Sequence, residues 1–171
     1  MKSLRESLLD DDLVEKTDKM IKDDIKAFLK ENYVGIFKIS NKPNTDGKYE
    51  VSSTKNIEVK NQKITSLTNG MFIWTTVNGS FDCMRCYFLN TLKGAPKEVG
   101  GSFDCSMIDA LTSLKGAPEK VGGNFNCSRC KSLTSLEGAP KEVGIDFECM
   151  RCESLKSLEG APKEVRNMFI C

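Results

Sequence analysis

The chain has 171 residues, of which 39% are hydrophobic and 29% charged, an ordinary composition for a globular protein with its own core. The net charge is +1, and acids balance bases both in residues 1–70 and in residues 71–171. We therefore expect no nucleic-acid partner, since such binders carry a basic block. No apolar run could span a membrane, and the acidic opening MKSLRESLLDDDL is unlike a secretory signal. These features predict a cytoplasmic protein with reduced thiols.

The first third of the chain predicts a helical segment and a hairpin. In residues 1–33 one helical face is apolar, and residues 3–9 are expected to form a separate short helix. The acids of residues 10–12 indicate a helix start or a solvated linker rather than a metal site. Two strand-like stretches flank the turn-rich sequence NKPNTDG, which predicts a β-hairpin cap over residues 34–54.

The solenoid is expected to span residues 55–171, and from residue 81 onward the sequence repeats with a period of 22 residues. Each repeat has the same order of core candidates: a phenylalanine, a cysteine two positions later, two leucines, the turn GAP and a valine. The phenylalanines and cysteines fall at Phe81, Phe103, Phe125, Phe147 and Phe169 and at Cys83, Cys105, Cys127, Cys149 and Cys171. In the last full repeat the second leucine is Leu158, which is expected in the core. Four full repeats and the start of a fifth are present.

The sequence before the first full repeat predicts a degenerate first coil. Ile57 and Val59 occupy the phenylalanine and cysteine columns there. The longer stretch TNGMFIWTTVNG replaces the GAP turn, and we expect residues 71–77 to bulge or to pair locally. Atypical terminal repeats are common in solenoids because they cap the core.

Each repeat has a simple physical interpretation. The alternation in SFDCS is typical of a short strand with phenylalanine and cysteine facing inward. Glycine and proline then turn the chain, and KEV returns along the outside with its valine in the core. A single coil cannot cover its own apolar face, so neighbouring coils must stack and share one core. The expected result is a parallel-stranded solenoid.

The repeat FxCxxCxxLxSLxGAPxxV resembles a leucine-rich repeat in which cysteine occupies the usual asparagine column. The sequence SLEGAPKEVGG is similar to repeat arrays in bacteriophage proteins, notably those of phages of gut bacteria. The sequence MKSLRESLLDDDLVEKTDK resembles a leader on such proteins. The resemblance covers about residues 55–171 and implies a small horseshoe that recognises proteins. Departures from the pattern occur at Ile108, Ile145 and Asn167. The expected fold is α+β: a leucine-rich-repeat solenoid behind a helical segment and a hairpin cap.

The cysteines allow more than one interpretation. Two CxxC pairs with eighteen residues between them match the spacing of a zinc site, with the candidate ligands Cys127, Cys130, Cys149 and Cys152. The first cysteine of the pair persists, however, in repeats that lack the second. This favours buried packing over zinc binding, with redox use as a third alternative. We expect no cofactor. The chain has no histidine, and an inward thiol is poorly placed as a nucleophile, so we expect no enzymatic activity.

A surface is then the candidate functional site. Residues that alternate with the inward columns vary between repeats and are expected on a concave strand face. They form a mixed basic and apolar strip with acidic neighbours, and arginine and methionine are enriched in interface cores. The candidate partner-binding residues are Met84, Arg85, Met107, Arg129, Met150, Arg151, Asp82, Asp104, Asn126 and Glu148.

We expect the partner to be a protein of an infected bacterial host. One hypothesis is an antagonist of a bacterial defence effector such as a CRISPR nuclease, acting in the host cytoplasm; the alternative is a virion-associated structural or cargo protein. The last strand also carries apolar side chains with no following coil. It predicts a homodimer edge at Met168, Phe169, Ile170 and Cys171.

Overall fold

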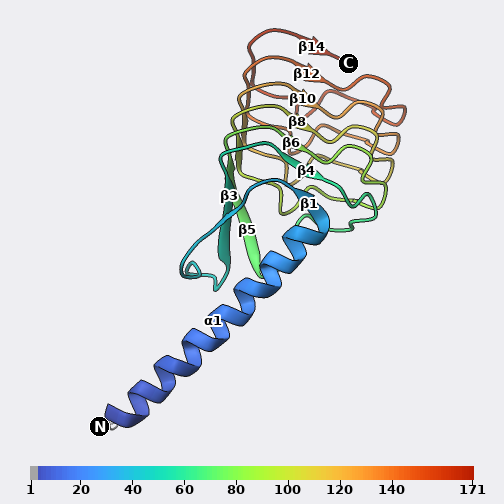
Figure 1. Cartoon of the computed structure of the whole chain (residues 1–171). Coiled ribbons are helices and arrows are strands. Elements are labelled where there is room, and N and C mark those ends of the chain that lie inside the picture. The colour runs from blue at the N-terminus through green and yellow to red at the C-terminus, as the bar shows by residue number, and fades with distance from the viewer. Residues whose placement is uncertain (1–3) are drawn as a thin grey trace.

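The computed structural model describes the backbone of residues 4–171 and the side chains from residue 17 onward. The fold is a β-solenoid of about six turns of stacked parallel strands, preceded by one helix. Figure 1 shows the coils stacked one above another, with the helix at the first coil and the C-terminus at the last.

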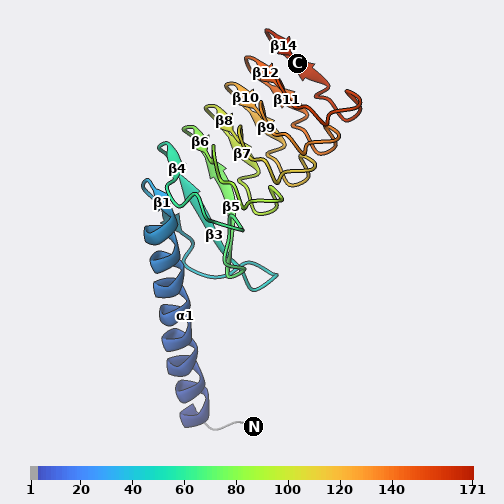
Figure 2. The ribbon, with the colours of Figure 1, turned by 90° about the vertical axis from the view of Figure 1, so that its right-hand side faces the viewer.

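A single helix, α1 (Leu4–Asn32), occupies the N-terminal segment. The prediction of a separate short helix at its start is wrong, because residues 4–9 belong to the same continuous helix. Residues 10–12 lie inside this helix. Near its C-terminal end Ile25 and Leu29 are fully buried, and the ring of Phe28 lies 5.9 Å from that of Phe72. The remainder of α1 extends away from the coils (Figures 1 and 2). Only the last turns of the helix are therefore held by the core.

The hairpin prediction is confirmed, but its first residues join another sheet. Strands β2 (Lys38–Ile39) and β3 (Tyr49–Ser53) pair antiparallel, and the side chain of Asn44 accepts two backbone hydrogen bonds in the turn between them. Strand β1 (Tyr33–Val34) pairs antiparallel with β4 (Ile57–Val59) instead. The segment after the helix thus caps both sheets of the first coil.

Two seven-stranded sheets form two sides of the stack. The first contains β1, β4, β6 (Phe81–Asp82), β8 (Phe103–Asp104), β10 (Phe125–Asn126), β12 (Phe147–Glu148) and β14 (Phe169–Ile170). The second contains β2, β3, β5 (Phe72–Val77), β7 (Glu98–Val99), β9 (Lys120–Val121), β11 (Glu142–Val143) and β13 (Glu164–Val165). The register is the sequence period itself, since each phenylalanine pairs with the one 22 residues on.

The second sheet was not expected from the sequence. The KEV segments form strands of their own. In residues 71–77 the expected bulge is present, because the register with β3 shifts by one residue between Trp74 and Val77. Strand β5 pairs in parallel with both β3 and β7. The sequence did not predict that β5 would also supply the return strand of the first coil, where its backbone groups find partners on either side.

A ladder of phenylalanine rings runs through the core. Successive ring centroids from Phe81 to Phe147 lie 5.6, 5.5 and 5.3 Å apart with nearly parallel planes. Phe169 continues the stack at 5.0 Å but is 39% exposed because no coil covers it in the structure. Leu158, expected in the core, is 52% exposed for the same reason. Burial is complete only where a coil has neighbours on both sides.

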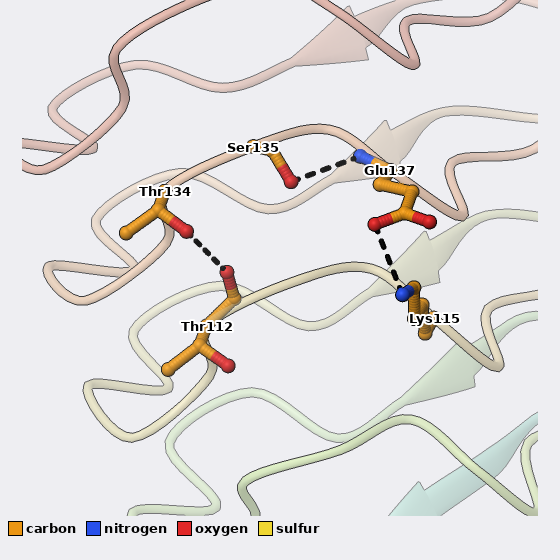
Figure 3. A network of polar contacts seen from close by, with 5 residues as sticks. All are labelled: Thr112, Lys115, Thr134, Ser135 and Glu137. Atoms are coloured by element: carbon orange, nitrogen blue, oxygen red, sulfur yellow. Dashed lines mark hydrogen bonds and ion pairs between the residues drawn. The ribbon is translucent and has the colours of Figure 1, made fainter.

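Polar side chains align the coils along the surface. Lys115 of one coil lies 3.0 Å from Glu137 of the next, and the Thr134 hydroxyl donates to the Thr112 carbonyl at 3.1 Å. Figure 3 shows how these side chains lie between the two coils. Within its coil the Ser135 hydroxyl accepts the backbone N–H of Glu137. An exposed ion pair of this kind contributes about 0–1 kcal/mol to the stability of a protein. Such pairs therefore favour the register of the coils but supply little of the total stability.

The GAP turn shows why the repeat needs glycine at one position. Gly138 has a φ of +89°, and a Cβ added to it would lie 2.6 Å from the Cα of Lys115 in the preceding coil. Both the left-handed backbone and the close approach of two coils therefore exclude a side chain.

We expect Phe125→Ala to lower the free energy of unfolding by about 3–5 kcal/mol, because it removes a buried ring from between two stacked neighbours. Phe169→Ala is the matched control, since its ring has one neighbour and is partly exposed. Urea unfolding followed by circular dichroism measures both. Equal losses for the two variants would contradict the stacking account.

Candidate functional site

A column of strained residues follows the strands of the first sheet. Arg85, Met107, Arg129 and Arg151 have φ values of 61°, 59°, 60° and 57°, and they are the non-glycine residues with positive φ in the described chain. A residue with a Cβ pays about 1–2 kcal/mol for this left-handed conformation, which glycine or asparagine adopts more easily. We call these four residues the left-handed column.

Asparagine and aspartate side chains build the turns that hold this column. Oδ1 of Asp82, Asp104 and Asn126 accepts the backbone N–H two residues later, at 2.8, 2.8 and 2.9 Å. These are Asx turns, which fold the chain directly ahead of the left-handed residue. In the next coil glutamate occupies this position, and the hydroxyl of Ser128 accepts the N–H of Met150 instead. Three predicted partner-binding residues thus have a structural role that the sequence analysis missed.

Backbone bonds between coils align the column in one row. The backbone N–H of Arg129 donates to the carbonyl of Met150 at 2.8 Å, and equivalent bonds hold Arg85 and Met107. The three arginine side chains are exposed and make no ion pair or side-chain hydrogen bond within the described chain. Met107 is half-buried between them. The structure therefore brings the predicted arginines together with their charges unpaired.

The methionines divide between two columns. Met107 belongs to the left-handed column, whereas Met84 and Met150 lie one position earlier, where the intervening coils carry the buried Ser106 and Ser128. Met150 is 42% exposed. The apolar part of the predicted strip is thus discontinuous along the row.

An acidic row lies on the strands beside the arginines. The outward residues Asp82, Asp104 and Glu148 fall in register with Glu58 of β4, which the sequence analysis did not include. Partial burial raises the pKa of Asp82, and the nearby charges of Asp104 and Glu58 raise it further. Asn126 interrupts the row and donates weakly to Asp104 at 3.5 Å. The strand face therefore presents opposite charges in adjacent columns.

The cysteines have partners of their own. Buried thiols donate to carbonyl oxygens of neighbouring coils, as from Cys130 to Cys105 and from Cys152 to Cys127 at 3.2 Å each. Burial raises the pKa of the Cys130 thiol to about 12, which opposes formation of a thiolate. Cys149 is joined to Cys171 by a disulfide, so the expectation of reduced thiols is wrong for this pair.

The four cysteines of the zinc alternative are therefore engaged elsewhere, three as thiols within the core and one in the disulfide. Across the described residues, no three His, Cys, Asp or Glu side chains form a group that could hold a metal ion.

The predicted dimer edge lies at the uncovered end of the stack. Met168 is 51% exposed, Ile170 is half-buried, and Cys171 is tied back by its disulfide. The outer side of β14 has no strand partner within the described chain.

No family model, curated protein or solved structure matches the chain. Its function therefore has to be argued from its own geometry. No helix in the described part of the chain has the length and apolar character needed to cross a membrane.

Substitutions at Arg129 test the strain in the left-handed column. Arg129→Gly should leave the free energy of unfolding within about 1 kcal/mol of the wild type, because glycine accepts a positive φ. Arg129→Val should lower it by about 1–2 kcal/mol, because a β-branched residue resists this conformation. The same pair at exposed Ser132, where φ is not positive, is the control. If Arg129→Val left the free energy of unfolding unchanged, the strain at this position would be contradicted.

Asp82→Asn tests the acidic row. Because the folded state raises the pKa of Asp82, its ionisation opposes folding as the pH rises through that pKa. Asparagine keeps the acceptor for Met84 but cannot ionise. The variant should therefore gain stability over the wild type at about pH 7, and the gain should disappear in acid below the ordinary aspartate pKa. Urea unfolding against pH measures this, with Asp46→Asn as the exposed control. A gain that persists in acid would count against the electrostatic cause.

Proposed function

We propose that the chain is a non-enzymatic protein-binding module that recognises its partner through the left-handed column and the adjoining strand face. The observation that carries this proposal is the row of three exposed arginines, which have no ion-pair partner among the described residues. Each has a backbone conformation that glycine would adopt at a lower free-energy cost. Strain of this kind tends to persist at functional sites. Arginine is also the charged residue most often found in interface cores.

Charge favours a protein over a nucleic acid as the partner. The acidic row lies directly beside the arginines and would repel a phosphate backbone, whereas a protein surface can match both signs. The absence of histidine from the sequence and the raised pKa of the Cys83 and Cys105 thiols support a binding role over an enzymatic one.

The finer identity of the module is also a proposal. The stacked parallel coils support the leucine-rich-repeat type. The resemblance of the repeat sequence to arrays in bacteriophage proteins supports a bacteriophage origin. We propose an antagonist that binds a bacterial defence effector, such as a CRISPR nuclease, in the cytoplasm of the infected host.

Reversing the arginine charges tests the binding surface. Arg85, Arg129 and Arg151 are changed together to Glu, and the tagged protein is used to capture partners from a lysate of infected bacteria. The variant should lose the partner that the wild type captures, while its circular dichroism stays unchanged because the side chains are exposed. Mass spectrometry identifies and quantifies the captured protein.

The repeat supplies a matched control. Lys97, Lys141 and Lys163 are also exposed and have the same spacing of 44 and 22 residues, but they precede the strands of the second sheet. Changing them to Glu alters the net charge equally and should leave capture intact. If the arginine variant retains its partner at full strength, the proposed surface is wrong.

A second candidate function follows from helix α1, most of which extends away from the coils (Figure 2). Such a helix could dock the chain on a virion, making it a structural or cargo component. The capture experiment separates the two: a defence effector supports the antagonist, and a capsid protein supports the virion component.

A further inference from the structure

A cleft lined by lysines lies where α1 meets the first coil. Its volume is about 670 Å³, and four of its lining residues are lysines, whereas none is acidic: Lys22, Lys26, Lys30 and Lys60. The whole chain carries almost equal numbers of acids and bases, so this is a local concentration of positive charge. Val34, Phe37 and Ile39 add apolar surface. The cleft suits a ligand that is both acidic and apolar.

The lysines are only partly engaged within the chain. Lys22 donates to the carbonyl of Asn41 at 2.6 Å, and Lys26 pairs with the exposed Asp23 at 2.9 Å. Lys30 and Lys60 make no side-chain hydrogen bond or ion pair in the described part of the chain. A smaller hollow of about 450 Å³ continues along α1 and adds two acids, Asp18 and Asp23, with Lys19 and Lys42. Together they form a groove along the helix.

The sequence of this chain contains a segment of the complementary composition. Residues 4–15 carry five acids against one arginine, together with four leucines. The backbone of this segment is the first half of α1, which leads away from the coils (Figures 1 and 2). Within one chain this half cannot reach the groove, because both belong to the same continuous helix. A second copy can supply it.

The spacing along the helix fits such a pairing. Positions 11 and 15 have the same separation as positions 22 and 26, and helical periodicity places all four on one face of α1. Two antiparallel helices related by a two-fold axis between residues 18 and 19 would therefore place Asp11 opposite Lys26 and Glu15 opposite Lys22. Every contact would occur twice by symmetry.

We propose that two copies of the chain pair through antiparallel α1 helices, with the acidic half of each helix in the lysine-lined groove of the other. The groove is then completed by residues of the second copy. Exposed opposite charges on facing helices give small individual contributions that salt screens. The dimer should accordingly be stronger at low than at high ionic strength. This surface is separate from the left-handed column.

Complementary charge reversal is the sharpest test. One variant carries Lys22→Glu and Lys26→Glu; the other carries Asp11→Lys and Glu15→Lys. By sedimentation equilibrium each alone should dimerise at least about tenfold more weakly than the wild type, because repulsion replaces attraction. An equimolar mixture should recover a species of twice the chain mass. The control is the variant with Glu at Lys97, Lys141 and Lys163, which should dimerise normally.

A cysteine at the two-fold axis tests the register. Lys19→Cys lies beside its own symmetry mate in the proposed dimer, whereas Glu31→Cys lies opposite the far end of the partner helix. Under mild oxidation the first should give a covalent dimer, above the background of the unmodified chain, and the second should not.

Several results would overturn the proposal. A wild-type chain that stays monomeric at high concentration and at about 0.1 M salt, where screening is moderate, refutes self-pairing. So does a dimer that is indifferent to salt, or a mixture of the two variants that fails to recover it. If a variant does not fold, the salt dependence of the wild type and the Lys19→Cys cross-link decide the matter.

Discussion

The parallel backbone ladder between successive coils is the constraint on which the structure depends. In each coil the amide of the phenylalanine donates to a carbonyl of the next coil, at 2.8 Å from Phe125 to Asp146, and the cysteine amide does the same from Cys127 to Glu148. From Phe81 onward this register sets each strand residue of the first sheet directly beside the one 22 positions away. The aromatic stack, the leucine columns and the surface rows all follow from it.

The same register that repeats stabilising contacts also repeats conformations and charge contacts that lower the stability. Because each position is repeated, an unfavourable feature is multiplied along the stack: the left-handed residue recurs four times, and the acidic row sets like charges side by side. The chain offsets part of this with Asx turns and with Asn126 in the acidic row. Arginine remains in the strained column nevertheless, which is why the binding proposal is placed there.

Much of the core could be predicted from the sequence. Phe125 and Cys127 recur at a fixed interval beside polar neighbours, and that pattern predicts inward columns for a strand of any solenoid. The second sheet was missed because a two-residue strand such as Glu142–Val143 has no pattern of its own and is stable only through its neighbours. The burial of Leu158 was wrongly predicted for a related reason, since periodicity does not show where the stack lacks a cover.

The sequence by itself determined the columns: which residues repeat, which alternate with them, and hence which arginines share a row. Only the tertiary structure decided the conformation of Arg129, because a positive φ depends on the Asx turn before it and the coil beside it. It also decided the joining of Cys149 to Cys171 and the gathering of lysines between the helix and the first coil. These features arise between segments whose separation in space no local pattern encodes.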